Sequence, residues 1–411
     1  MIQLSENNIE TLLQKILPYF FTLVFITTIV GALSGYLEHN SWKMGDWLIN
    51  YQGGMVRRGL LGEVIYQLAH LTHLNPGLYV VAFQAFFYAV FLFFSYALLK
   101  KQHALLPYAL LIFSPFIFTF QINDLQGGFR KEIIYLALLS FVVWTARTRD
   151  PKTFEKVFYI ILLLYPAVIL THEMLAIYLP FLLVAYLSSV TLTRKKFFFL
   201  LLLLTPSIVS FLVAIYYSGT SIQVVDIFNS IAKENYPLTG GAISWLDRNS
   251  SYGIALVTKQ LNEQHYAYYI LLVPLAALAY IPIHERLKSI AKNRLSLFLI
   301  LISIVGSAGL FIVAIDWGRF IYITLVSIFL LSLISTQDIE VHHQRDRYNQ
   351  PVNLFIALFF SIYSLFWHIP HCCSIDSTLV KNYKQINIVL FAKPYAKVLF
   401  YIFPNLKSKI K

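Results

Sequence analysis

The chain has 411 residues, of which 58% are hydrophobic and only 13% are charged. Soluble domains carry about 25% charged residues, and the mean hydropathy here is +0.66, so the composition excludes an ordinary soluble enzyme. The net charge of +12 arises from Lys and Arg in short segments between apolar runs, a pattern typical of anchors to anionic lipid. The predicted partner is therefore the lipid bilayer, and no nucleic acid is expected.

Apolar runs of about 17–25 residues, the length that crosses a bilayer, recur along most of the chain. They predict an all-α polytopic integral membrane protein with about 11–12 transmembrane helices. The predicted spans lie near 16–36, 77–99, 104–122, 132–146, 157–171, 174–192, 197–217, 266–283, 295–315, 320–335, 352–369 and 387–403. The last run contains Lys393, Pro394 and Lys397, so it either crosses the membrane or lies along its surface.

Residues 1–411 are predicted to form a single membrane domain. Its parts are a module at 16–217 with a long external loop at 37–76, a second long external loop at 218–265, and C-terminal helices at 266–411. In the first loop, apolar residues recur at helical spacing over 55–72, which predicts an amphipathic helix in the membrane interface. The second loop contains "ENYPLTGGAISWLDRNSSYG", a composition typical of a mobile or substrate-ordered segment.

The distribution of Lys and Arg predicts the orientation. These residues are more abundant in the loops on the side of the N-terminus than in the opposite loops, which favours a cytoplasmic N-terminus. We expect a multi-pass protein of a bacterial cytoplasmic (inner) membrane. The cytoplasmic loops are plain, whereas the outer loops carry mixed charges, glycine and tryptophan, as in "DWGRF". A functional site is therefore expected at the outer face.

Two outer segments resemble each other: "NYQGGMVRRG" at 50–59 and "NDLQGGFRKE" at 123–132. Glycine lets backbone N–H groups approach a ligand closely, and a helix start attracts anions. Adjacent guanidinium and ammonium groups would add charge-assisted bonds to phosphate oxygens. The predicted phosphate-binding residues are Gly53, Gly54, Arg57, Arg58, Gly127, Gly128, Arg130 and Lys131. Alternatively, these are turns whose cations contact lipid headgroups or pair with Glu63 and Glu132.

Ionisable residues interrupt the apolar runs near the outer boundary, where they are costly unless paired or facing a wet cavity. Asp46, Asp124 and Glu173 are the candidate catalytic carboxylates, because a carboxylate near apolar groups and cations can act as general base on a hydroxyl. His172, Asp316 and Arg319 are candidate substrate-binding residues. Alternatively they are helix caps and ion pairs, such as Asp316 with Arg319 or Asp124 with Arg130.

Together, carboxylates and several cations at the outer interface suit the displacement of a lipid-linked phosphate from a sugar by an acceptor hydroxyl. Trp47, Tyr51, Trp245 and Trp317 are candidate platforms for sugar rings, although an aromatic belt at the interface explains them equally well. No His, Cys and Asp set has metal-ligand spacing, so no metal or other cofactor is predicted; the carboxylates alone leave a divalent cation open.

The layout resembles the GT-C class of membrane glycosyltransferases, which use polyprenyl phosphate-linked sugars. The resemblance covers 16–217, where Asp46 and the helix at 55–72 follow the first span and Asp124 lies in the second external loop. It implies an active site open to the extracytoplasmic face. Many members have an acidic pair where Asp46 stands alone, so Asp124 or Glu173 are alternative bases. The layout is also similar to O-antigen polymerase-type proteins, which use external arginines.

The predicted function is glycosyl transfer from a polyprenyl phosphate- or diphosphate-linked sugar to an acceptor hydroxyl, in cell-surface glycan or polysaccharide assembly. The protein would be a membrane glycosyltransferase or polysaccharide polymerase, with the polyprenyl-linked sugar as substrate partner. The alternative is a transporter or flippase of a glycolipid or small anion, and a third hypothesis is a non-catalytic assembly or anchoring protein. The sequence makes no prediction of the sugar, the acceptor or the oligomeric state.

Overall fold

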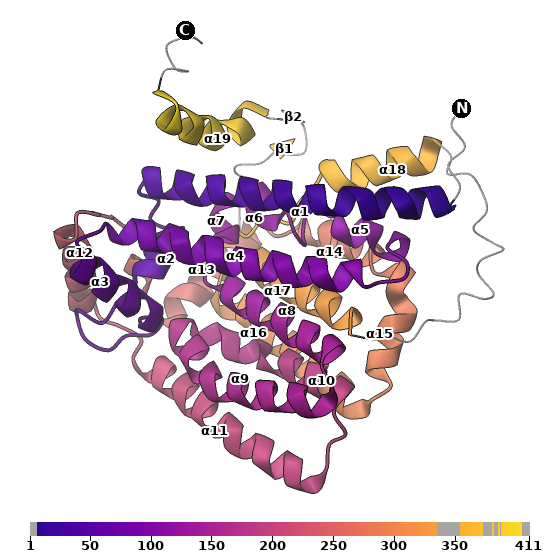
Figure 1. Cartoon of the computed structure of the whole chain (residues 1–411). Coiled ribbons are helices and arrows are strands. Elements are labelled where there is room, and N and C mark those ends of the chain that lie inside the picture. Colours follow the sequence, from indigo (N-terminus) through magenta and orange to yellow (C-terminus); the bar gives the residue numbers. More distant parts are fainter. Residues whose placement is uncertain (1–5, 335–353, 373–379, 382–384, 387, 405–411) are drawn as a thin grey trace.

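The computed structural model describes residues 6–334, 354–372, 380–381, 385–386 and 388–404 (Figure 1). Helices dominate these residues, and the strands within them are one antiparallel pair, β1 (Val380–Lys381) with β2 (Gln385–Ile386). The longer helices are α1 (Glu6–Leu37), α4 (Pro76–Lys100), α8 (Glu132–Thr148), α9 (Pro151–Thr171), α10 (Leu179–Ser189), α11 (Arg194–Tyr216), α14 (Tyr269–Leu278), α16 (Arg294–Val313), α17 (Trp317–Ser332), α18 (Leu354–Leu365) and α19 (Ile388–Ile402).

Several long helices begin where the sequence supplies a capping side chain. Asn75 accepts a hydrogen bond from the backbone N–H of Gly77 at the start of α4, and Asp150 accepts from two N–H groups at the start of α9. Thr193 caps α11 and Asn293 caps α16 in the same way. Such caps satisfy N–H groups that have no partner inside the helix, so these boundaries follow from local sequence.

Five helices in the described part of the chain are long and apolar enough to cross a membrane: Asn8–Leu37, Pro76–Lys100, Pro151–Thr171, Arg194–Tyr216 and Arg294–Val313. A sixth span results if α14 and the helical segment Ile281–Ala291, bent by 43° relative to each other, are counted as one. α10 and α17 are apolar but shorter. The predicted all-α architecture with several apolar helices is confirmed, while the number of spans that cross a bilayer stays a prediction.

The predicted span at 104–122 differs from the structure. This stretch contains three short helices, η1 (Leu106–Tyr108), α5 (Ala109–Ile112) and α6 (Phe120–Asn123). Pro107 and Pro115 lie within it, and proline removes a backbone donor and clashes with the preceding turn of a helix. Hydropathy alone did not distinguish this buried, broken stretch from a continuous span.

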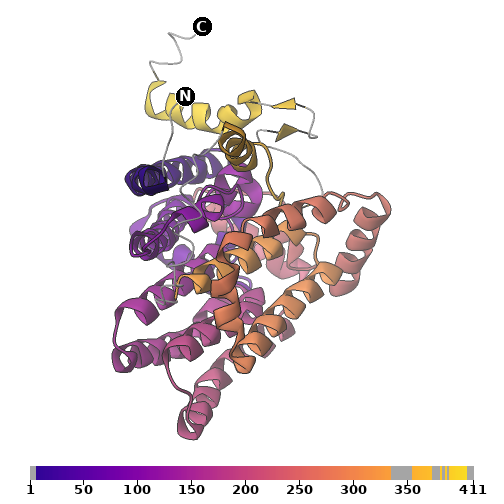
Figure 2. The same ribbon diagram turned by 90° about the vertical axis from the view of Figure 1, so that its right-hand side faces the viewer.

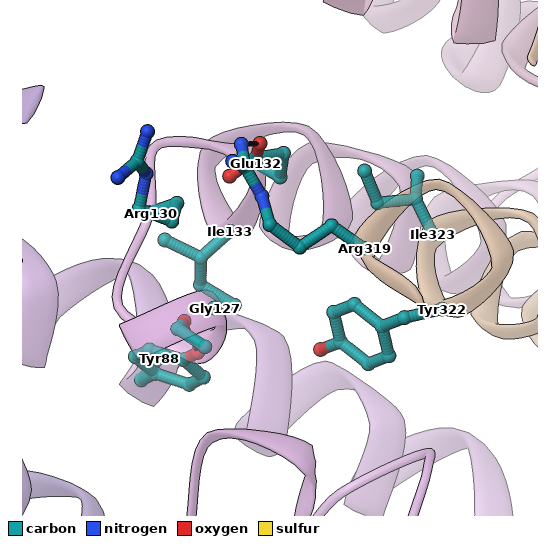
Figure 3. A pocket seen from close by; sticks show the side chains of 9 residues that line it. Tyr88, Gly127, Arg130, Glu132, Ile133, Arg319, Tyr322 and Ile323 are labelled. Atoms are coloured by element: carbon teal, nitrogen blue, oxygen red, sulfur yellow. Dashed lines mark hydrogen bonds and ion pairs between the residues drawn. The ribbon is translucent and has the colours of Figure 1, made fainter. Parts of the chain in front are cut away.

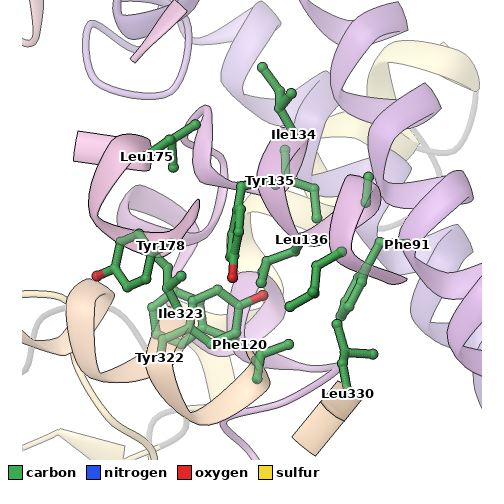
Figure 4. Close-up of a cluster of buried hydrophobic side chains, with 14 of the residues drawn as sticks. Phe91, Phe120, Ile134, Tyr135, Leu136, Leu175, Tyr178, Tyr322, Ile323 and Leu330 are labelled. Carbon is green, nitrogen blue, oxygen red and sulfur yellow. The ribbon is translucent and has the colours of Figure 1, made fainter. Parts of the chain in front are cut away.

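α8 lies at the centre of the molecule, packed against α4, α10 and α17. Figure 4 shows part of this core, in which Tyr135 of α8 lies among side chains from neighbouring elements. The ring of Phe120 stacks on that of Tyr322 at 4.0 Å between centroids. In contrast, α11 and α16 expose apolar side chains, such as Leu202 (66% exposed) and Val305 (69% exposed). These exposed apolar faces suit contact with lipid.

The two long loops meet at the end of the bundle where α1 ends and α4 begins (Figure 1). Asn50 Nδ2 donates to Ser230 Oγ at 3.0 Å, and Asn75 Nδ2 donates to the Asn235 carbonyl at 3.1 Å. These bonds hold the loop at 218–265 against the loop at 37–76.

Viewed from the side, α18, α19 and the strands lie along α1, at the opposite edge of the molecule from α11 (Figure 2).

The second loop is more ordered than its composition suggested. It contains α12 (Ser221–Lys233), η3 (Ile243–Trp245) and α13 (Ser250–Asn262). A capping box at Thr220 and Gln223 starts α12, which buries Val224, Ile227 and Ile231. This apolar face packs against the rest of the protein, while the interpretation of 218–265 as a mobile or substrate-ordered segment stays a prediction.

The amphipathic helix of the first loop is present as α3 (Leu60–Thr72), after the four-residue helix α2 (Gly45–Leu48). It starts later than the predicted 55–72 because the chain turns first, with φ of +106° at Gly54 and +67° at Arg58. Ile65 and Ala69 are buried, while Leu71 is exposed. Its location in a membrane interface remains a prediction.

Candidate functional site

The two similar segments at 50–59 and 123–132 contact each other. The Lys131 ammonium donates to the Arg58 carbonyl at 2.7 Å, and the Lys131 backbone N–H donates to Asp46 Oδ2 at 3.3 Å. The Trp47 indole N–H donates to the Phe129 carbonyl at 2.8 Å. Five stretches of chain meet here: α2 and the turn after it, the start of α8, the break between α9 and η2 (Glu173–Tyr178), the start of α17, and the loop before α13.

A cavity of about 580 Å³ opens beside these segments, a volume within the roughly 300–1,000 Å³ of ligand pockets. Its lining has three kinds of surface. Charged side chains come from Arg57, Arg58, Arg130, Glu173, Arg248 and Asp316; aromatic and polar ones from Trp42, Trp245, Asn249, Ser218 and Ser250; and apolar ones from Phe211, Ala214 and Ile215 of α11 and Leu310 and Val313 of α16. We call the charged residues of the lining the floor. The cavity therefore connects a mainly cationic floor to the apolar faces of α11 and α16, which suit contact with lipid.

Arg58 and Glu173 form a fork-to-fork ion pair in the floor. Arg58 Nε donates to both Glu173 oxygens at 3.0 and 2.9 Å, and its Nη2 donates to Oε1 at 2.6 Å. The backbone of Arg58 is in the left-handed region, at φ +67°, which is uncommon outside glycine and often marks functional sites. This conformation directs the guanidinium at Glu173, whose two oxygens are both occupied.

Arg57 is the cavity guanidinium without a carboxylate partner among the described residues. Its Nη2 donates to the Trp245 carbonyl at 3.0 Å and its backbone N–H to the Tyr217 carbonyl at 2.7 Å. Its buried Nε has no hydrogen-bond partner within the described chain. Because the Arg57 side chain lines the cavity, its guanidinium can bind an anionic group there.

Asp46 lies beneath the cavity and not in its lining. The side chain is fully buried, with Oδ2 3.4 Å from Arg130 Nε. Burial alone would raise the pKa of Asp46, but Arg130 and Lys131 outweigh burial and hold that pKa well below its usual range. Burial lowers the pKa of Lys131 to about 8 against the opposing charge of Asp46. Asp46 thus anchors the two cations of the 123–132 segment.

A second group of ion pairs joins the start of α8 to the start of α17. Arg319 pairs with Glu132, as Figure 3 shows, and also with Asp316, where Nη1 donates to Oδ2 at 2.8 Å. The imidazole of His172 lies 3.6 Å from Glu132 Oε1 and 3.6 Å from Glu173 Oε2. Burial and the charge of Arg58 lower the pKa of His172 to about 3, so the ring is neutral. The predicted Asp316–Arg319 pair is confirmed, and it is linked to the floor through Glu132 and His172.

Asp124 lies apart from the cavity lining. Its Oδ2 accepts from the His371 backbone N–H at 2.6 Å and contacts His371 Nδ1 at 2.7 Å, and its Oδ1 accepts from the Gly127 N–H at 2.8 Å. The partner of Asp124 is therefore His371, and the predicted pairing with Arg130 is wrong because Arg130 lies against Asp46. This contact fastens the C-terminal segment to the loop before α7 (Leu125–Gly128).

The four predicted phosphate-binding glycines pack against protein. A Cβ on Gly53 would lie 2.9 Å from the Gln223 carbonyl of α12, and Gly54 also faces Gln223. A Cβ on Gly127 would collide with His371, and one on Gly128 with the Gln121 backbone. Gly127 and Gly128 border a small cavity of about 10 Å³ that Arg319 also lines; Figure 3 shows Gly127 there. At these four positions the nearest atoms belong to other segments of the protein, so the glycines allow close packing between segments of the chain.

Comparison with protein-family models, with curated proteins and with solved structures finds no match to this chain. Within the described residues, no group of three or more His, Cys, Asp or Glu side chains could hold a metal ion.

Sequence reasoning identified most of the floor but missed several of its neighbours. Arg57, Arg58, Arg130, Glu173 and Asp316 line the cavity as a group, and Asp46, Lys131, His172 and Arg319 support them from beneath. Glu132, Trp42, Arg248 and His371 were not selected. Glu132 could have been identified from the sequence, because it follows two cations at the start of an apolar run. Nothing local distinguishes His371 or Trp42.

Proposed function

We propose that this chain transfers a sugar from a polyprenyl phosphate- or diphosphate-linked donor to an acceptor hydroxyl at the extracytoplasmic face of a bacterial inner membrane, in cell-surface glycan assembly. One observation carries the proposal: a single cavity joins four guanidinium groups to the apolar faces of α11 and α16. A ligand with a phosphate headgroup and a hydrocarbon tail matches both surfaces.

The donor would bind with its phosphate on the floor and its tail between α11 and α16. Arg57 and Arg58 provide charge-assisted hydrogen bonds to phosphate oxygens. The carboxylate of Glu173 holds Arg58 in place, and the carboxylate of Asp46 holds Arg130. Because both oxygens of Glu173 accept from Arg58 and Asp46 is fully buried outside the cavity lining, the proposal gives these two carboxylates a positioning role.

Asp316 is the best-placed general base in the cavity. Its side chain is 29% exposed, compared with 13% for Glu173, and the Arg319 guanidinium contacts its Oδ2. In the proposed step, the acceptor hydroxyl transfers its proton to Asp316 while the acceptor oxygen forms a bond to the anomeric carbon. The bond from that carbon to the phosphate oxygen breaks, and the phosphate keeps the electron pair, stabilised by Arg57 and Arg58.

The test uses full-length protein in nanodiscs with radiolabelled lipid-linked sugars extracted from bacterial membranes. Asp316→Asn should lower kcat by about 10²–10⁴-fold, the usual contribution of a general base. Arg57→Ala should lower kcat/KM by roughly 10–100-fold, as expected for the loss of a charge-assisted hydrogen bond. Arg194→Ala, at an exposed arginine on α11, is the matched control and should retain full activity.

Two outcomes would contradict the proposal. Full activity of Asp316→Asn would exclude Asp316 as the general base and with it the proposed step. Counterflow of labelled glycolipid in proteoliposomes, with no new covalent product, would show that the protein is a transporter and not a transferase. A transporter is expected to carry its charges near the midplane of related halves, whereas the charged residues of this cavity lie in the two long loops and beside the ends of α8, α9 and α17.

A further inference from the structure

Two tryptophans from different loops form one wall of the cavity. Trp42 lies in the first loop and Trp245 in the second; their ring centroids are 6.1 Å apart and the planes are inclined by 57°. The Tyr252 ring meets Trp245 edge-on at 5.8 Å. Arg130 lies over the Trp42 ring at 5.4 Å, and Arg248 over the Tyr252 ring at 4.9 Å. We name Trp42 and Trp245 the aromatic wall; Tyr252 packs against Trp245 and does not line the cavity.

The aromatic wall is held by backbone contacts on both sides. The Ala242 N–H donates to the Ser41 carbonyl at 3.2 Å, next to Trp42. The Trp42 N–H donates to Asn40 Oδ1 at 3.1 Å, and the Trp245 carbonyl accepts from Arg57. Because the Ala242–Ser41 bond joins the two loops, the backbone segments that carry the two rings are placed side by side before any ligand arrives, which lowers the entropic cost of binding.

The other tryptophans first considered as platforms have different surroundings. Trp47 is fully buried and bonded to the Phe129 carbonyl. Trp317 stacks on Tyr266 at 3.9 Å and on Phe311 at 4.8 Å, and it does not line the cavity. Of the tryptophans in the described chain, Trp42 and Trp245 are those that border the cavity.

Polar groups suited to hydroxyls surround the aromatic wall. Asn249, Ser250, Ser218 and Arg248 line the same cavity as the two tryptophans. A pyranose ring presents a face of C–H groups that packs on an aromatic ring and an edge of hydroxyls that needs donors and acceptors. Apolar surface with a few placed polar groups is how pockets orient small ligands. The aromatic wall offers the surface on which the C–H face can pack, and the polar residues of the cavity offer donors and acceptors for the hydroxyls.

We infer that the aromatic wall is the binding site of the acceptor, and that the acceptor is a saccharide whose ring stacks on Trp42 and Trp245. This inference rests on the proposed function and assigns the parts of one cavity: the floor to the donor phosphate, α11 and α16 to the lipid tail, and the aromatic wall to the acceptor. Asp316 lines the same cavity, so an acceptor hydroxyl can meet both the base and the anomeric carbon.

The experiment measures saccharide binding without catalysis. Saturation-transfer difference NMR on the protein in nanodiscs uses the methyl glycosides of glucose, galactose, mannose and N-acetylglucosamine as probes. We expect at least one probe to receive magnetisation. Trp245→Ala and Trp42→Ala should each weaken its binding by about three- to tenfold, and Trp245→Phe should retain most of it because a flat ring remains. Trp144→Ala, at a half-buried tryptophan that does not line the cavity, should leave binding unchanged.

A parallel titration with decyl phosphate separates this inference from the proposed function. If decyl phosphate binds and Arg57→Ala weakens it, but all four glycosides fail to bind or bind equally well to Trp245→Ala, the aromatic wall is not a saccharide site and serves only as an interfacial anchor. If the glycosides bind through the wall while decyl phosphate does not bind, the donor assignment fails and the saccharide site stands.

Discussion

At the scale of single residues, Asp124 and His371 form the contact that closes the C-terminal segment onto the site region. Burial disfavours the imidazolium, but the Asp124 carboxylate outweighs burial and raises the pKa of His371 above its usual value. For Asp124, burial is outweighed by His371 and by backbone N–H donors, which lower its pKa to about 2. Both shifts favour the charged pair in the folded protein.

The pair predicts a pH dependence of stability. Its contribution from His371 is fully present below the unfolded pKa of about 6.5 and is lost as the pH rises through the raised folded pKa. The contribution from Asp124 is present above its unfolded pKa of about 4 and is lost only as the pH falls towards 2. Between pH 6 and 9 we therefore expect the Tm of the wild type to fall relative to that of His371→Gln, which lacks the pair.

Thermal unfolding in nanodiscs, followed by tryptophan fluorescence, measures this change. His371→Gln should remove the decline in Tm above neutral pH, whereas His103→Gln, at an exposed histidine, should keep it. An identical slope in wild type and His371→Gln would show that the pair does not titrate in this range.

At the scale of elements, one glycine allows a close contact between the second loop and the first. Gly241 has φ +67°, and a Cβ there would collide with the Ser41 carbonyl. Gly240 has the same φ of +67°, but nothing lies within 4 Å of its Cβ position. Substitutions at Gly240 and Gly241 therefore distinguish the cost of a left-handed backbone from the cost of a clash with Ser41.

We expect Gly240→Ala to cost about 1–2 kcal/mol, the penalty of an L-residue in the left-handed region. Gly241→Ala should cost a further ~1–3 kcal/mol, because the clash pushes the loops apart. Denaturant unfolding measures both values, and limited proteolysis of 218–265 should accelerate for Gly241→Ala alone. Equal behaviour of the two variants would mean that the contact with Ser41 does not hold the loop.

At the scale of the whole molecule, the proposal depends on which surface carries the cavity. Gln52 in the first loop and Lys259 in the second are exposed near the cavity end, and Lys195 is exposed at the start of α11. With a membrane-impermeant maleimide on intact cells, Gln52→Cys and Lys259→Cys should be labelled, and Lys195→Cys only after lysis. The wild-type chain gives the background. The reverse pattern would place the cavity in the cytoplasm and exclude an extracytoplasmic donor site.

The outline of the fold could be predicted from the sequence because it depends on local terms. Helix starts follow from capping residues such as Asn75 and Asp150, and long apolar runs mark the membrane-suited helices. The break at His172 and Glu173 is visible as charges within an apolar stretch, and the structure has it between α9 and η2. Charge and hydropathy along the chain also identified most cations of the cavity floor.

What only the tertiary structure decided is which of these groups face a common space. Asp46 and Asp316 are both acids near apolar runs, yet the first is buried under Arg130 and the second borders the cavity. Asp124 pairs with His371, 247 residues away in the chain. Trp42 and Trp245 meet only because the second loop docks on the first. Such pairings depend on long-range packing, and no local pattern of residues encodes them.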